Sequence, residues 1–190
     1  METAVYIILT LVILISIAII TNYAIILIKN IIKKRSNKIS LGSSTKVRIF
    51  YQLKEALEIL AKTKTGAIIT IENNDNLDSL RTDGIVLDAN ISSSILISIF
   101  NKYSPLHDGA VIIRNNKIYY VGTFYKITKK SIDNKYGARH RAALGISEMC
   151  DASTLVVSEE NGGVSLAENG SLTSIPLENL QETLTKIFKD

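Results

Sequence analysis

Cysteine, histidine and tryptophan are scarce in this chain of 190 residues. The sequence has one cysteine, Cys150, no tryptophan, and only two histidines, His107 and His140. A single cysteine permits no internal disulfide, and it leaves no C-x-x-C pair for a zinc or redox site. Cys150 lies between apolar helix and strand patterns, so we interpret it as a small core residue.

The common nucleotide-binding and metalloprotease motifs are also missing. The sequence has no Walker A loop, no G-x-G-x-x-G fingerprint and no H-E-x-x-H helix. We find no internal repeat, and no low-complexity tract beyond one apolar run. Any nucleotide chemistry in this chain must therefore use a less common scaffold.

The apolar run lies near the N-terminus. Residues 4–28, AVYIILTLVILISIAIITNYAIILI, are 25 residues without a charged side chain. About 20 apolar residues are enough for a helix to cross the hydrocarbon core of a bilayer. A buried core helix would carry an amphipathic stripe, and a signal peptide would have its basic residues before the run. The run therefore predicts one transmembrane helix within residues 1–30.

Basic residues follow the apolar run and predict its orientation. Only one acid, Glu2, precedes residue 49, whereas seven basic residues do: Lys29, Lys33, Lys34, Arg35, Lys38, Lys46 and Arg48. The positive-inside rule places this end of a span in the cytoplasm. We expect a single-pass protein of the cell membrane with its N-terminus outside, a basic juxtamembrane linker at residues 31–45 and a cytoplasmic domain at residues 46–190.

The net charge of +4 does not indicate nucleic-acid binding. Residues 49–190 contain 15 basic and 17 acidic residues, so this part carries a net charge of −2. The positive charge is confined to the segment beside the predicted span, where it suits anionic lipid headgroups. We expect no nucleic-acid partner.

The cytoplasmic part alternates helical and strand patterns. Apolar residues three and four apart predict a first helix that is capped at Ser44 or Thr45 and ended by Gly66. β-Branched runs bounded by turn residues predict strands, and residues 115–117 predict a hairpin turn. The predicted strands are 67–72, 84–90, 109–114, 118–124 and two within 153–170; the later helices are a serine-capped helix at 92–100, then 138–150 and 177–188. We expect an α/β domain with a mixed central β-sheet flanked by helices.

His107, Asp108 and Gly109 stand at the entrance to the strand that continues from Ala110. These three residue types weaken a strand, so their presence calls for another reason. A carboxylate and an imidazole at the end of a sheet are available for chemistry, and a glycine lets a ligand approach the backbone closely. The alternative is an ordinary Asp-Gly turn.

Arg139, His140 and Arg141 fall in the first turn of the predicted helix at 138–150. Cations at this end oppose the helix dipole, so helix stability does not account for them. Free N–H groups, the positive end of the dipole and two guanidiniums together suit a polyanion such as triphosphate. The alternative is a solvated basic patch.

Ser158, Glu159 and Glu160 follow an apolar strand. Two adjacent carboxylates repel each other unless a cation joins them. One of them, together with His107, would supply oxygen and nitrogen ligands for a divalent ion such as Mn²⁺. The alternative is an acidic β-turn.

Three of these segments together resemble the catalytic domain of diadenylate cyclases. They are PLHDGAVII, RHRAALGISE and VVSEENGG, in this order. The resemblance runs from about Val47 to the C-terminus, and the single predicted span is similar to the one-helix, mycoplasma-type membrane cyclases. It implies that two ATP molecules condense to cyclic 3′,5′-di-AMP and two pyrophosphates, between two domains of a face-to-face homodimer.

The resemblance also implies roles for individual residues. Asp108 would orient the attacking 3′-hydroxyl or help to deprotonate it, and Arg139, His140 and Arg141 would hold phosphates. His107 and Glu160 match the family's metal ligands, with Mn²⁺ or Mg²⁺ as the expected ion and Co²⁺ as a further candidate. The positions that match nucleotide-binding residues are Gly109, Ala110, Phe124, Tyr125, Ala138, Ser158 and Glu159.

The sequence departs from the family's pattern at two of these positions. Tyr125 stands where an aliphatic residue is usual, and Ala138 stands where many relatives have threonine. We expect altered affinity for ATP and retained activity. Two other functions are compatible with the motifs: a membrane-tethered nucleotide sensor without turnover, and a metal-dependent phosphohydrolase, which usually needs more histidine and aspartate ligands than this chain offers.

Overall fold

The computed structural model describes residues 6, 11–26, 43–133 and 136–189. The chain divides into two compact units, Met1–Ile39 and Ser40–Asp190. In the first unit, residues 11–26 are helical. Among the described residues, no helix combines the length and the apolar character needed to span a membrane. Within the predicted span, the structure describes Tyr6 and residues 11–26; the rest of the span lies outside the described residues.

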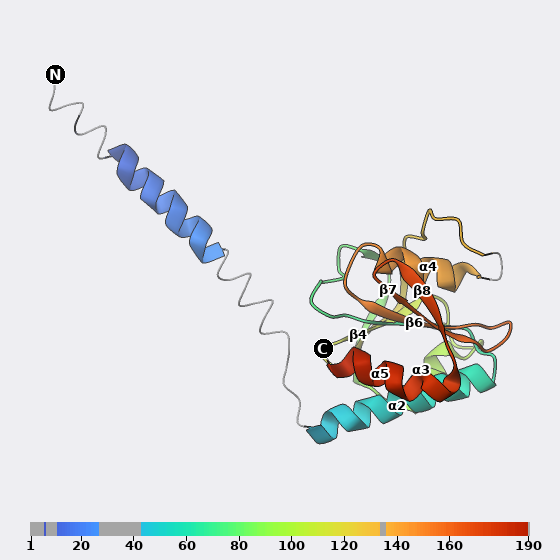
Figure 1. Cartoon of the computed structure of the whole chain (residues 1–190). Coiled ribbons are helices and arrows are strands. Elements are labelled where there is room, and N and C mark those ends of the chain that lie inside the picture. Colours follow the sequence, from blue (N-terminus) through green and yellow to red (C-terminus); the bar gives the residue numbers. More distant parts are fainter. Residues whose placement is uncertain (1–5, 7–10, 27–42, 134–135, 190) are drawn as a thin grey trace. The chain divides into compact units, whose positions relative to one another are not determined.

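A mixed sheet forms the centre of the second unit (Figure 1). Its strands lie in the order β2–β5–β4–β1–β6–β7–β8, and β3 also pairs with β5. β1 and β4 are parallel, whereas the other pairs are antiparallel. The strands are β1 (Ala67–Ile71), β2 (Arg81–Thr82), β3 (Ile85–Asn90), β4 (Ala110–Arg114), β5 (Lys117–Tyr125), β6 (Ser153–Val157), β7 (Val164–Glu168) and β8 (Ser171–Ile175). The predicted α/β fold with a mixed sheet is confirmed.

Helices cover both faces of this sheet (Figure 1). The helices α2 (Ser43–Lys62), α3 (Ser93–Phe100) and α5 (Leu180–Lys189) lie on one face, and α4 (Ala138–Ser147) lies on the other. The first three share a buried cluster with Ile69 of β1, while α4 shares a second cluster with Ile68. Because successive side chains of a strand point to opposite faces, β1 is buried on both sides.

The pairing of β1 brings three separate segments to one edge of the sheet. β1 runs parallel to β4, so the residues before Ala67 and those before Ala110 enter the sheet at the same edge. β1 runs antiparallel to β6, with Ala67 opposite Val157, so the chain leaves β6 at that edge as well. Gly66, the Asp108–Gly109 pair and the Ser158–Glu159 pair are therefore neighbours in space.

Most predicted elements are present, and the hairpin turn is the best defined. Asn115 and Asn116 have φ angles of 50° and 64°, as the two central residues of a type I′ turn require. Two strands were not predicted, β2 and β8. The predicted helix at 177–188 begins as a 3₁₀ turn, Leu177–Asn179, and becomes α-helical at Leu180.

Two local predictions are wrong. The side chain of Ser92 makes no capping hydrogen bond to α3; instead, Gln52 of α2 accepts the backbone N–H of Ser93 at 2.9 Å. Helix packing thus supplies the partner that a hydroxyl was expected to supply. Cys150 is only partly buried at the border of the α4 cluster, because the chain turns toward the surface between α4 and β6.

Arg114, at the end of β4, ties the sheet to the loop that follows β1. Its guanidinium donates to the two carboxylate oxygens of Glu72 at 2.6 and 2.7 Å and to Asp78 at 2.9 Å. The hydrogen bond from Arg114 is the main reason why the pKa of Asp78 lies below its ordinary value. The side chains of Glu72 and Arg114 are only 6% and 12% exposed, so neither charge has water as a substitute partner.

We predict that Arg114→Ala lowers the free energy of unfolding by about 3 kcal/mol, because it leaves a buried carboxylate without its partner. Lys117→Ala is the matched control: its ion pair with Asp88 is exposed, and such pairs contribute about 1 kcal/mol or less. Urea denaturation of each variant measures the difference. Equal losses in the two variants would contradict a structural role for the Arg114 network.

Candidate active site

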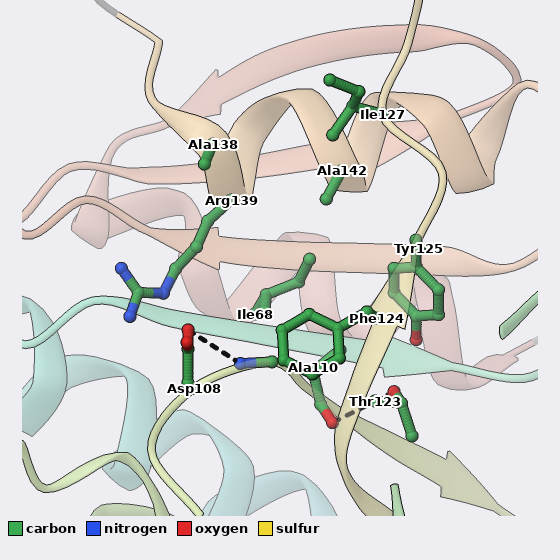
Figure 2. A pocket seen from close by; sticks show the side chains of 11 residues that line it. Ile68, Asp108, Ala110, Thr123, Phe124, Tyr125, Ile127, Ala138, Arg139 and Ala142 are labelled. Carbon is green, nitrogen blue, oxygen red and sulfur yellow. Dashed lines mark hydrogen bonds between the residues drawn. The ribbon is translucent and has the colours of Figure 1, made fainter. Parts of the chain in front are cut away.

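A cavity of about 160 Å³ lies between α4 and the edge of the sheet where β4 begins. Figure 2 shows its lining side chains, which come from α4, from β5 and from the start of β4. Seven of the residues predicted from the sequence line it: Asp108, Gly109, Ala110, Phe124, Tyr125, Ala138 and Arg139. Ligand cavities for drug-sized molecules usually measure about 300–1,000 Å³, so this cavity suits a part of a nucleotide, such as its base.

The backbone around Gly109 sets the position of Asp108. Gly109 has a φ angle of +87°, and a Cβ atom there would lie 2.7 Å from the carbonyl oxygen of Thr123. Both the conformation and the close contact therefore require glycine. The N–H of Gly109 donates to Oδ1 of Asp108 at 3.2 Å, which leaves the exposed carboxylate at the mouth of the cavity (Figure 2).

Arg139 lies on the opposite rim of the cavity, in the first turn of α4. Its Nη1 donates to Glu159 at 2.8 Å; the Arg139 side chain is 24% exposed and that of Glu159 is 66% exposed. Figure 2 shows the guanidinium extending from α4 toward the side where Asp108 lies. A cation held by an exposed carboxylate remains accessible to an anionic ligand, because surface ion pairs contribute only about 0–1 kcal/mol.

The absence of a side chain at Gly66 leaves space for this ion pair. A Cβ atom at Gly66 would lie 2.7 Å from Nη1 of Arg139 and 2.9 Å from Oε2 of Glu159. The sequence predicted Gly66 only as the end of the first helix. Its contact with Arg139 depends on the pairing of β1 with β6, which no local pattern reveals.

Two aromatic residues at the end of β5 form one wall of the cavity. Phe124 is 44% exposed and Tyr125 is buried. Burial raises the pKa of the Tyr125 phenol above its ordinary value, although the neighbouring Thr70 and Thr123 hydroxyls act in the opposite direction. The phenol is therefore neutral, and the wall is suited to a flat, uncharged ring.

His107 lies just before this cavity, and its imidazole has a fixed orientation. Nδ1 lies 2.7 Å from the carbonyl oxygen of Ser104. A carbonyl only accepts hydrogen bonds, so Nδ1 is the donor in this contact, and in the neutral imidazole Nε2 is then the nitrogen with the lone pair. This tautomer leaves Nε2 available to a metal ion, with the other ring nitrogen held by an outer partner.

The predicted metal site at His107 and Glu160 has less direct structural support. Among the described residues, no group of three or more His, Cys, Asp and Glu side chains is arranged to hold a metal ion. Glu160 is exposed, and its charge acts on His140. A metal at His107 and Glu160 would therefore need further ligands from substrate or water. The imidazole of His107 and the carboxylate of Glu160 are ligand types that divalent ions accept. The role of these two residues as metal ligands stays a prediction.

His140, Arg141 and Ser158 do not line the cavity beside Asp108. His140 is 5% exposed, and its ring lies 5.0 Å from that of Tyr136. Burial lowers the pKa of His140, Glu160 raises it, and Arg139 lowers it further. With Ser158, His140 instead lines a second, polar cavity. The predicted roles of these three residues in phosphate binding stay predictions.

The structure adds lining residues that the sequence motifs did not indicate: Ile68, Thr123, Ile127 and Ala142. Ala142 follows Ala138 by four residues, so the two small side chains share one face of α4 and leave room for the cavity. That spacing was visible in the sequence. Ile68 and Thr123 had no distinguishing signal, because both continue ordinary strand patterns.

Comparisons with known proteins agree with this geometry. Residues 54–172 match the DAC family, described as "DisA bacterial checkpoint controller nucleotide-binding". The chain is 44% identical to the cyclic di-AMP synthase CdaA of Bacillus subtilis over 137 residues, which is 71% of this chain and 50% of that protein. It is 43% identical to the diadenylate cyclase of Mycoplasma pneumoniae over 134 residues, which is 70% of this chain and 66% of that protein.

Solved structures show the same fold. A double mutant of DacA from Staphylococcus aureus is 36% identical, with a TM-score of 0.74, and the match covers 78% of this chain and 100% of that one. A hypothetical membrane spanning protein from Bacillus cereus is 42% identical, with a TM-score of 0.65, over 66% of this chain and 62% of that one. The chain thus spans about half the length of the Bacillus synthase and just under two thirds of the Mycoplasma cyclase.

The family match covers more than half of the chain, and it includes the Asp108 strand entrance, the Arg139 helix and the Ser158 turn. This chain therefore belongs to the DAC domain family of diadenylate cyclases.

Proposed function

We propose that this chain condenses two ATP molecules into cyclic 3′,5′-di-AMP and releases two pyrophosphates. The observation that carries the proposal is one cavity with a wall suited to adenine, a carboxylate at its mouth and a guanidinium on its rim. The two relatives named as a cyclic di-AMP synthase and a diadenylate cyclase support the same reaction.

The proposed step is an in-line displacement at phosphorus. The 3′-oxygen of one nucleotide bonds to the α-phosphorus of the other, and the bond from that phosphorus to the pyrophosphate oxygen breaks. Asp108 accepts a hydrogen bond from the attacking hydroxyl and helps to take its proton. Arg139 and Arg141 balance the charge on the phosphoryl oxygens, and Ser158 and Glu159 lie at the phosphate end.

A single domain supplies one nucleotide, so the reaction needs a second copy of the domain. The cavity has room for one base, and the carboxylate stands at its open mouth. In a face-to-face homodimer, each Asp108 would serve the hydroxyl of its own nucleotide beside the α-phosphate of the partner's nucleotide. We propose this dimer as the active form.

A divalent ion fits the same proposal. His107, held in the tautomer with Nε2 free, and Glu160 would hold Mn²⁺, Mg²⁺ or Co²⁺. Such an ion polarises a phosphoryl oxygen when it is bound.

We further propose that residues 4–28 anchor the chain in the cell membrane, with the catalytic domain in the cytoplasm. The support is the run of 25 uncharged residues and the basic residues that follow it.

Incubation of the purified chain with ATP and Mn²⁺ tests the activity directly. We predict a product with two AMP units in one ring by mass spectrometry, together with pyrophosphate. Asp108→Asn should reduce the rate at least about 100-fold, the usual contribution of a positioned acid or base, with an unchanged melting temperature. ATP binding without pyrophosphate release would identify a nucleotide sensor instead, and release of inorganic phosphate would identify a hydrolase.

Metal removal gives a second prediction. Excess EDTA should abolish turnover, and added Mn²⁺ should restore it, because His107 and Glu160 offer too few ligands to retain an ion against a chelator. His107→Ala should raise the Mn²⁺ concentration needed for half-maximal rate by at least about tenfold, whereas saturating Mn²⁺ recovers part of the activity. Full activity in EDTA would remove the ion from the proposal.

Gly66 gives a third prediction, aimed at the Arg139–Glu159 pair. Gly66→Ala should displace the guanidinium and raise the KM for ATP about tenfold, equivalent to about 1.4 kcal/mol. Gly137→Ala is the control, because a Cβ atom there meets nothing within 4 Å. Since the displaced atoms end flexible side chains, the melting temperature of Gly66→Ala should change little. An unchanged KM would show that the position of Arg139 is not critical.

A further inference from the structure

The segment that leaves β5, residues 126–130, lies directly against α4. A Cβ atom at Gly145 of α4 would collide with the carbonyl oxygen of Lys126 and lie 2.8 Å from the nitrogen of Thr128. The backbone of the segment therefore touches the helix where the helix has no side chain. The N–H of Thr128 also donates to the carbonyl of Arg141 at 3.1 Å, so the segment is hydrogen-bonded to α4 as well as packed on it.

The side chain of Thr128 holds the segment at a second point, the end of α4. Thr128 is 7% exposed, and its Oγ1 donates to Oε1 of Glu148 at 2.8 Å. The same hydroxyl oxygen accepts the N–H of Lys130 at 3.0 Å. Glu148 directly follows the last residue of α4, and Nζ of Lys130 lies 3.2 Å from its carboxylate. A hydroxyl that donates and accepts in this way has one orientation, so Thr128 ties the segment to Glu148.

Ile127 lies between two backbone positions that are both held. Before it, Tyr125 pairs with Arg81 in the sheet; after it, Thr128 is bound to α4. Ile127 is nevertheless 57% exposed, and it lines the cavity beside Asp108. Single exposed apolar side chains are common on protein surfaces, but this one cannot turn away from the cavity without breaking the Thr128 hydrogen bonds.

Ile127 and Phe124 face the cavity from two sides. In Figure 2, Ile127 is drawn on the α4 side of the cavity and Phe124 on the sheet side. Phe124 is also partly exposed, at 44%. Two apolar side chains that are open to solvent on opposite walls suit a flat ring that would cover both of them.

We infer that the hydrogen bond between Thr128 and Glu148 positions Ile127 as the second wall of the base site and thereby sets the affinity for the nucleotide. Glu148 and Thr128 do not line the cavity, so they are positioning residues that act through Ile127. The inference rests on the proposed function in one respect, namely that the ring in the cavity is the adenine of ATP.

The test measures the equilibrium affinity of the 190-residue chain for 3′-deoxy-ATP in the presence of Mn²⁺, by calorimetry. This nucleotide lacks the attacking hydroxyl, so binding is measured without turnover. Ile127→Ala should weaken binding about tenfold, because an apolar side chain of this size loses its contact with the base. Thr128→Val and Glu148→Ala should each weaken it about threefold to tenfold, the usual effect of one hydrogen bond.

Two further variants separate the hydrogen bond from other effects. The double variant Thr128→Val, Glu148→Ala should bind no more weakly than the weaker single variant, because both changes remove the same contact. Glu148→Gln should bind within about twofold of the wild type, since its amide oxygen still accepts the hydroxyl proton. Thr183→Val is the matched control: it removes a hydroxyl that donates to the carbonyl of Asn179 in α5, on the other face of the sheet.

Two readouts place the effect at the base. Inorganic triphosphate, which has no base, should bind equally to the wild type and to all of these variants. In turnover with ATP, the KM should rise in Thr128→Val and Glu148→Ala while kcat stays within about twofold, because the groups at the reacting phosphorus are not displaced.

Three results would overturn the inference. They are unchanged affinity for 3′-deoxy-ATP in Thr128→Val and Glu148→Ala, a loss in Glu148→Gln as large as that in Glu148→Ala, and equally weakened binding of triphosphate. Ile127→Ala tests the wall itself even where removal of the buried hydroxyl unfolds the chain, and wild-type affinity in that variant would also contradict us. A chain that forms no ring product but shows these affinity losses refutes the cyclase and keeps the inference, whereas a ring product with unchanged affinities does the reverse.

Discussion

The position of strand β1 determines how the rest of this domain is assembled. Every residue of β1 is buried, and the strand pairs in parallel with β4 and antiparallel with β6. These two pairings alone bring Gly66, the Asp108 turn and the Ser158 turn to one edge of the sheet. Because helices pack against both faces of β1, a shift of one residue would exchange the side chains that meet the two buried clusters, so the register is well defined.

Two arginines differ in burial, and this difference decides whether the guanidinium stabilises the fold or remains accessible to a ligand. Arg114 is nearly buried and holds Glu72 at both carboxylate oxygens, so it fixes the end of β4 that is far from the Asp108 turn. Among the described residues, the ion-pair partner of Arg139 is the exposed carboxylate of Glu159. The same residue type thus stabilises the scaffold in one place and remains available to a ligand in the other, and the difference follows from burial.

The sequence predicted well the features that depend on local physics. The Asn115–Asn116 turn, the buried strand β1 and the helix that begins with Ala138 each follow from residue type and spacing. It predicted poorly what depends on distant partners: β8 is mostly exposed and polar, and β2 has two residues, so neither carries a strand pattern. In the site, Asp108 and Arg139 were found because a carboxylate before a strand and a cation at a helix start both need explanation, whereas Gly66 looked like an ordinary helix end.

The geometry around Arg139 also bears on the departure at Ala138. Both residues belong to the first turn of α4 and line the same cavity, and Ala138 is exposed. An exposed hydroxyl at this position would face the cavity, where a ligand could use it. Arg139 is available to compensate, because the carboxylate of its partner Glu159 is exposed and a phosphate could replace it. The absence of a side chain at Gly66 leaves space for the guanidinium. We therefore expect the departure to act on affinity for a ligand and to leave the fold unaffected.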